Sequence, residues 1–270
     1  MTGDASLAGR TPDPAVFAPG TFSPDPRPSS PGRMTLAATR TELRIQLRNG
    51  EQLLLAIVIP AAVLLGLTLT GLIKLDEPRV DTATPGVLAL ALLSSAFTGQ
   101  AITTAFDRRY GVLQRLAAAG MSRSLLLAGK CGSVLAVVCG QFAVLGFVAA
   151  LLGWHPAGSW PLAVPVSLLG VLALVGMALL IGGTLRAEAV LAVANLLWLA
   201  MVGIGGVIVP LTAAPGWLRT VGDLTPVGAL SDGLRAALQL DTAPTLPIWS
   251  VLVVWAVAAW AATVRWFRWQ

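Results

Sequence analysis

Charged side chains are scarce in this sequence. Asp, Glu, Lys and Arg make up only 11% of the 270 residues, whereas a soluble domain usually carries about 25%. Hydrophobic residues make up 56%. A chain with so few charged residues lacks the polar surface that a water-soluble body needs, so we expect a membrane protein.

Residues that build chemical sites are equally few. His155 is the only histidine, and it lacks metal-ligand partners at a useful spacing. Cys131 and Cys139 fall in one predicted helix, about 12 Å apart along its axis, which is too far for a disulfide. The acids form no pair with a nucleophile or a base, and the G-x-x-x-x-G-K-S/T phosphate loop is missing. We therefore expect no enzyme activity, no metal and no cofactor in this chain.

Ionisable residues are almost absent from the apolar runs. A proton- or ion-coupled transporter usually carries such residues at membrane depth. The deepest polar groups here are amides and hydroxyls, chiefly those of Gln100, Gln141 and Asn195. Gln100 and Asn195 are candidates for lining a substrate pathway. The alternative, which is the more frequent use of such side chains, is hydrogen bonding between helices.

Six apolar runs approach the roughly 20 residues that span a bilayer as a helix. They predict an all-α integral membrane protein with six transmembrane helices, at residues 52–73, 85–106, 131–152, 162–185, 189–210 and 247–264. Residues 1–33 are rich in Pro and Ser and contain no apolar run. We expect them to form a disordered cytoplasmic tail, followed by the six-span domain at 34–270.

The residues just before the first run predict an amphipathic helix at 34–48. Leu36, Leu43 and Leu47 form one stripe, and arginines follow at four-residue steps beside it. This pattern suits a helix that lies in the membrane interface, with its arginines reaching lipid headgroups. A solvated lead-in to the first span is the alternative.

Basic residues are distributed unequally between the two sides of the predicted spans. With the N-terminus inside, the cytoplasmic side holds Arg40, Arg44, Arg48, Arg108, Arg109, Arg115, Arg123, Lys130, Arg186, Arg265 and Arg268. The outer side holds only Lys74, Arg79, Arg219 and Arg235. The positive-inside rule therefore predicts that both termini are cytoplasmic. The net charge of +5 is then explained by contacts with anionic membrane lipids, and we expect no nucleic acid partner.

The longest charged stretch between two apolar runs is at residues 106–130. An apolar stripe at helical spacing runs through Leu113 and Leu116, with arginines beside it. Gly120 suits the position after a helix C-terminus, and Ser122 suits the N-cap of the next helix. We expect a basic, amphipathic helix–break–helix that a cytosolic partner binds. The alternative is a basic loop that only sets the topology.

The longest outer connection, residues 211–246, is also patterned. Apolar spacing in 217–221 and 227–240 suits two short helices, which are punctuated by prolines. We expect an extracellular helical hairpin, re-entrant or interfacial, just before the sixth span.

Two sets of residues resemble the ABC-type-2 transporter permeases, which are the membrane subunits of many bacterial exporters of drugs, antibiotics and polysaccharides. The central stretch carries the first set: Asp107, Arg108, Arg109, Gly111, Leu113, Arg115, Leu116, Gly120, Ser122, Gly129 and Lys130. The outer hairpin carries the second: Pro215, Trp217, Leu218, Thr225, Pro226, Leu230, Asp232, Leu234 and Arg235. The resemblance covers residues 34–268. The sequence departs from the commoner pattern at Asp107, often Glu, and at 119–121, where many members have a proline.

The resemblance implies a half-transporter. Two permeases, identical or related, would form the translocation pathway, and a separate ATP-binding cassette subunit would bind ATP. A coupling helix at residues 110–119 would dock into that subunit through an apolar knob, and its arginines would pair with acids of the partner. The knob would consist of Val112, Leu113 and Leu116. The residues implied in coupling are Arg108, Arg109, Tyr110, Gly111, Val112, Leu113, Arg115, Leu116 and Gly120.

The function expected from these features is ATP-driven export of a hydrophobic or amphipathic substrate across a bacterial cell membrane. An apolar pathway without charge favours a drug, an antibiotic or a lipid over an ion. The alternative is a membrane anchoring or assembly protein that binds a cytosolic partner through the same segment and transports nothing.

Overall fold

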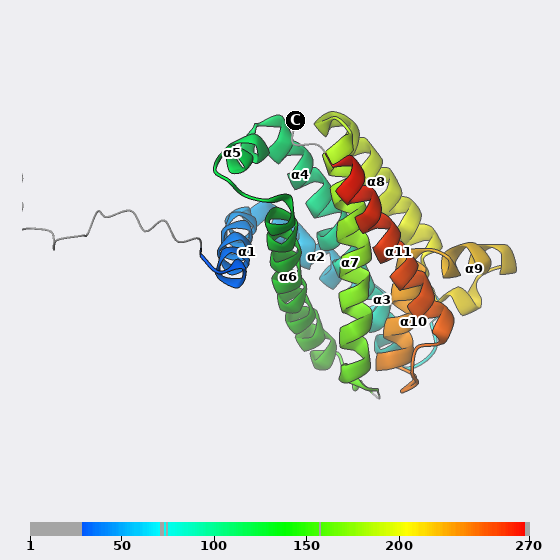
Figure 1. Cartoon of the computed structure of the whole chain (residues 1–270). Helices are drawn as coiled ribbons and strands as arrows, with labels where there is room; N and C mark the ends of the chain where they lie inside the picture. Colours follow the sequence, from blue (N-terminus) through cyan, green and yellow to red (C-terminus); the bar gives the residue numbers. More distant parts are fainter. Residues whose placement is uncertain (1–28, 71–72, 74, 157, 268–270) are drawn as a thin grey trace, which may run out of the picture.

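The structure, a computed structural model, describes residues 29–70, 73, 75–156 and 158–267. Within these residues all regular elements are helices (Figure 1), which confirms the all-α prediction. Residues 1–28, which make up most of the predicted tail, lie outside the described residues, as do Lys74 and Arg268 of the predicted topology.

Among the described residues, five helical segments are long and apolar enough to cross a membrane. They are Arg79–Arg109, α6 (Arg123–Leu151), α7 (Trp160–Thr184), α8 (Ala187–Ile204) and α11 (Leu246–Trp266). The predicted first span begins in α2 (Gly50–Leu69), whose apolar part, Ala56–Leu69, is shorter than these. The helices indicate a multi-pass membrane protein, and the count of six spans stays a prediction.

The second predicted span is part of a longer continuous segment. α3 (Arg79–Leu93), the π-helical η2 (Ser94–Gly99) and α4 (Gln100–Arg109) together make 31 residues. We predicted a start at Pro85, but Pro85 lies inside α3. A proline within a membrane helix is tolerated where neighbouring groups satisfy the carbonyl that it frees. The three elements form one continuous helical segment along the bundle, ending next to α5 (Val112–Ala118) (Figure 1).

Residues 211–246 contain the predicted pair of short helices, preceded by a single 3-10 turn, η3 (Leu211–Ala213). The helices are α9 (Gly216–Asp223) and α10 (Pro226–Leu238). The Thr225 hydroxyl caps α10 by accepting a hydrogen bond from the backbone N–H of Gly228, at 3.0 Å. α10 is almost entirely buried and contacts α3, α7 and α11, whereas α9 extends from the side of the bundle (Figure 1).

The centre of the bundle is α7, which packs on α3, α4, α6, α8, α10 and α11. The main core lies where α3, α7 and α10 meet, and it contains the fully buried Leu88, Leu174 and Leu230. The helices around this core expose apolar side chains on the side that faces away from it. The bundle therefore presents an apolar surface to its surroundings, as expected of a membrane protein.

The predicted amphipathic helix is present as α1 (Pro31–Arg48), which packs along the first half of α6. It begins three residues inside the predicted tail, because proline at the first helical position already has a helical φ. Gly129 allows the close approach, since a Cβ there would stand 2.8 Å from the Cβ of Ala38. Leu36 and Leu47 stay 49% and 55% exposed, so much of the predicted stripe is available for lipid.

Candidate functional site

The central charged stretch folds as the predicted helix–break–helix. α4 ends at Arg109, and Gly111 turns the chain into α5 with a φ of +68°, a conformation that glycine adopts without strain. Gly120 follows α5 with a φ of +83°, and the Ser122 hydroxyl caps α6 by accepting a hydrogen bond from the Leu125 N–H at 3.3 Å. The predicted glycine stop and serine cap are both confirmed.

Leu113 faces the protein rather than a partner. Its exposed fraction is 0%, and it packs with Leu126 of α6 and with Phe267, which follows α11. Leu116 is partly buried against the same small cluster. The prediction of an exposed apolar knob is therefore wrong for Leu113. A stripe at helical spacing indicates that a face is buried, but it does not say whether the cover is the same chain or another one.

The arginines of this segment also bind within the chain. Arg108 donates a hydrogen bond to the backbone carbonyl of Leu185, and Arg109 forms an ion pair with Glu188. Arg115 donates to the carbonyl of Tyr110 at 2.8 Å. The first two contacts hold the end of α4 against the residue that follows α7 and the first turn of α8. In this conformation Arg108 and Arg109 therefore position the segment, where we had expected them to pair with acids of a partner.

What remains for a partner is a mainly polar surface, the α5 face, formed by Tyr110, Gln114, Arg115, Ala117 and Ala118. Tyr110 is 63% exposed, and its ring stacks on that of Phe106 with the centroids 5.9 Å apart. The stacking holds an aromatic side chain at the surface in a fixed orientation, and exposed aromatic residues are frequent anchors in protein interfaces.

A buried ion cluster lies near the end of α4 that leads to α5. The Lys130 ammonium of α6 stands 2.8 Å from an oxygen of Asp107 and 3.3 Å from an oxygen of Glu42. The Lys130 side chain is 0% exposed. This Lys130 triad joins three elements, because Asp107 belongs to α4 and Glu42 to α1. It links the segment next to α5 to the amphipathic helix α1.

Sequence reasoning found two members of this triad without finding their contact. The motif of the central stretch contains Asp107 and Lys130, and it does not contain Glu42. Lys130 is 23 residues from Asp107 and 88 residues from Glu42 along the chain, so no local pattern signals either pairing. The only available signal was the cost of a lysine near the start of an apolar run, which demands an acidic partner.

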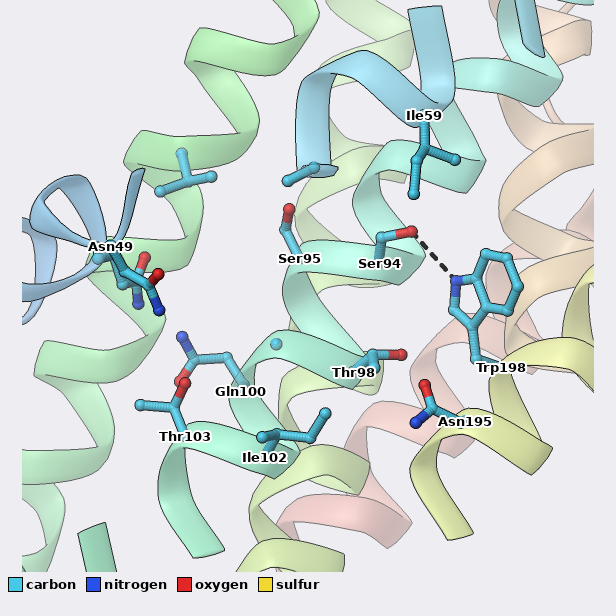
Figure 2. Close-up of a pocket in the computed structure, with 14 residues that line it drawn as sticks. Asn49, Ile59, Ser94, Ser95, Thr98, Gln100, Ile102, Thr103, Asn195 and Trp198 are labelled. Carbon is cyan, nitrogen blue, oxygen red and sulfur yellow. Dashed lines mark hydrogen bonds between the residues drawn. The ribbon is translucent and has the colours of Figure 1, made fainter. Parts of the chain in front are cut away.

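An open cavity of about 490 Å³ lies among α1, α2, α4, α6, α8 and η2. Both predicted pathway residues line it, and they come from different walls, Gln100 from α4 and Asn195 from α8 (Figure 2). Its described lining contains amides and hydroxyls but no charged side chain. Trp198 closes one wall by donating to the Ser94 hydroxyl at 3.1 Å.

The two predicted pathway amides, Gln100 and Asn195, do not bridge helices in the described residues. Gln100 is 2% exposed, and its Oε1 has no hydrogen-bond partner among the described residues. Asn195 donates to the Leu191 carbonyl of its own helix at 2.8 Å. Gln141 takes the interhelical role instead, donating to the Ala56 carbonyl and accepting from Ser95. A buried carbonyl without a partner is unusual in a folded protein, so it marks Gln100 as a candidate for a role other than bonding between helices.

The π-helical turn η2 was not predicted, and it supplies several lining residues, among them Ser94, Ser95 and Thr98. Such turns occur mostly as short interruptions of α-helices and are frequent at functional sites.

Comparison with known families finds a match. The family described as ABC-2 type transporter matches residues 34–238, which is more than half of the chain. The matched range contains the α5 face, the Lys130 triad and all the lining residues of the cavity. Comparison with curated proteins finds no match.

Proposed function

Because this chain belongs to the ABC-2 type transporter family, and is thus the membrane permease component of an ABC transporter, we propose that it works in export, as one half of a translocation pathway. A second permease copy, identical or related, forms the other half, and a separate subunit binds and hydrolyses ATP. The family match across the cavity and the α5 face carries this proposal.

The α5 face is the proposed docking site for the ATP-binding subunit. It is exposed, it lies at the end where arginines gather, and its backbone is held by internal contacts of Arg108, Arg109 and Leu113. Movement of a docked subunit would pass directly into α4, because only Tyr110 and Gly111 separate the two helices. Gln100 lies nine residues from Arg109, about 14 Å along the same helix.

This connection gives a route from ATP to the cavity. Closure of two ATP-binding subunits would push the α5 faces, tilt the α4 helices and shift the pair of permeases between inward- and outward-facing states. The positive end of the bundle is cytoplasmic in this proposal, in the bacterial cell membrane.

The cavity suggests the class of substrate. Its lining offers hydrogen-bonding amides and hydroxyls among apolar side chains, without a charge that would pair with an ion. Its volume of about 490 Å³ lies within the roughly 300–1,000 Å³ of ligand pockets. We therefore propose a neutral or weakly charged amphipathic molecule, such as a drug, an antibiotic or a lipid-like compound.

Substitutions on the α5 face test docking without disturbing the core. Arg115→Glu combined with Tyr110→Ala should reduce recovery of an ATP-binding subunit, in a detergent pull-down from the native membrane, by roughly tenfold. ATP-dependent export in vesicles should fall with it. The matched control is Arg219→Glu on α9, which reverses an exposed charge far from α5.

The pull-down can contradict either docking at the α5 face or the export proposal itself. Wild-type recovery of the ATP-binding subunit with the double variant would refute docking at the α5 face. If the intact native chain retains no ATP-binding subunit, under conditions that preserve a known exporter complex, the anchoring alternative replaces export.

Gln100→Leu tests the cavity. Because the Gln100 carbonyl is buried without a partner, its loss should leave stability unchanged or raise it by about 1 kcal/mol, while export falls. Gln141→Leu is the matched control, since it breaks two interhelical hydrogen bonds and should lower stability by about 1–3 kcal/mol. Thermal unfolding in detergent and vesicle transport measure the two effects. Unchanged export by a stable Gln100→Leu variant would exclude Gln100 from the pathway.

A further inference from the structure

A second hollow opens on the outside of the bundle, between α6 and α11. Its volume is about 650 Å³, and Leu172 of α7 lies at its floor. Figure 1 shows α7 running between the two other helices. Both α6 and α11 are candidate membrane spans, so this lateral groove faces the lipid region.

The walls of the lateral groove are apolar because their polar atoms are already paired. The Trp260 indole N–H donates to the Leu172 carbonyl at 2.9 Å, and the Thr263 hydroxyl donates to the Gly176 carbonyl at 2.8 Å. The remaining wall is built by Leu127, Ala128, Cys131, Val264 and Phe267. This lining contrasts with the cavity at Gln100, where a buried carbonyl is left unpaired. The groove suits a hydrocarbon chain.

One end of the groove is basic. Arg123 and Ser124, from the first turn of α6, line that end. Val264 and Phe267 line the groove from the α11 side. An apolar trough between spans with a guanidinium group at one end matches an anionic phospholipid, whose phosphate is carried by the glycerol that joins its acyl chains.

We propose that the lateral groove binds one anionic phospholipid, with an acyl chain against Leu127, Leu172 and Trp260 and the phosphate at Arg123. An open apolar hollow at the lipid-facing surface has to be filled, and a lipid fills it without ordering another protein. The site is separate from the α5 face and from the cavity at Gln100, and the proposal makes no use of transport.

Native mass spectrometry of the purified full chain tests the site directly. Dipalmitoyl phosphatidylglycerol is the probe, and dipalmitoyl phosphatidylcholine is the zwitterionic comparison. We expect one phosphatidylglycerol to be retained in preference to phosphatidylcholine. Arg123→Gln should weaken its binding about fivefold, since one basic side chain near a lipid surface contributes that much. Ala128→Phe, which fills the groove from α6, should abolish it.

The matched control is Arg219→Gln on α9, which removes an exposed arginine away from the groove and should leave lipid binding unchanged. Arg123 is exposed, so its variant keeps the fold even if Ala128→Phe does not. Equal retention of the two lipids, or unchanged phosphatidylglycerol binding by Arg123→Gln, would overturn the proposal. Displacement of the lipid by glycerol 3-phosphate, which has no acyl chains, would also overturn it. None of these results depends on an ATP-binding subunit, so the export proposal succeeds or fails separately.

Discussion

Lys130→Met is expected to lower the free energy of unfolding by about 3 kcal/mol, as measured by titration of the detergent-solubilised protein with a denaturing detergent. Breaking a buried ion pair by removing one partner typically costs about 3–5 kcal/mol. The lower end of this range applies because the Glu42 and Asp107 side chains are 13% and 24% exposed to solvent. The variant leaves two carboxylates facing an apolar side chain.

The size of this loss of stability follows from the burial of the Lys130 side chain, which is more complete than that of its two acidic partners. Lys130 is fully buried, so its charge is tolerated only because two carboxylates lie within 2.8 and 3.3 Å. Methionine fills nearly the same volume and leaves no cavity. What is lost is the countercharge between Glu42 and Asp107, whose mutual repulsion then acts between α1 and α4. We expect α1 to separate from α6 first, since the triad is one of the contacts that hold it there.

Two further variants make this expectation specific. Arg109→Met removes a cation from an exposed pair with Glu188, whose side chain is 65% exposed, and should cost less than about 1 kcal/mol. Neutralising the whole triad with Glu42→Gln, Asp107→Asn and Lys130→Met together should restore most of the lost stability. Equal losses for Lys130→Met and Arg109→Met would show that the triad is no more than a surface contact.

The triad also marks the limit of what local sequence patterns reveal. Gly120 and Ser122 predicted a helix stop and a helix cap correctly, because both are decided by residues within one turn of the chain. Lys130 needed an acid from another helix, and several were available. The pairing with Glu42 depends on how α1 lies along α6, which is set by the close approach at Gly129 and not by any spacing in the chain.

The cavity illustrates a different limit. Gln100 and Asn195 are predicted pathway residues because they are polar within apolar runs, and the structure places both on one cavity. The same reasoning offered Gln141, which instead bridges α6 to Ala56 and Ser95. Polarity within an apolar run therefore identifies side chains with a structural or functional role. Whether such a side chain bonds to another helix or keeps an unpaired acceptor depends on how the neighbouring helices are placed.

Leu113→Asp is expected to unfold α5 locally while the membrane-spanning bundle stays intact. Truncating a buried leucine to alanine already costs about 2–5 kcal/mol, and a buried carboxylate adds to this. Leu113 belongs to a small cluster with Leu126 and Phe267 that is separate from the main core. The loss therefore falls on α5 and the turn after it. Hydrogen exchange followed by mass spectrometry should show fast exchange at residues 112–118 and unchanged protection in α7 and α10.

The neighbouring position supplies the matched control. Gln114 is exposed and lies outside the cluster, so Gln114→Asp adds the same charge without entering it and should leave exchange in α5 unchanged. If the α5 face docks the ATP-binding subunit, Leu113→Asp also abolishes export, because a disordered segment cannot transmit a push to α4. Protected α5 amides in Leu113→Asp would contradict the inward packing of Leu113 and return it to the docking surface. Loss of protection throughout α7 and α10 would instead show that the small cluster is part of the main core.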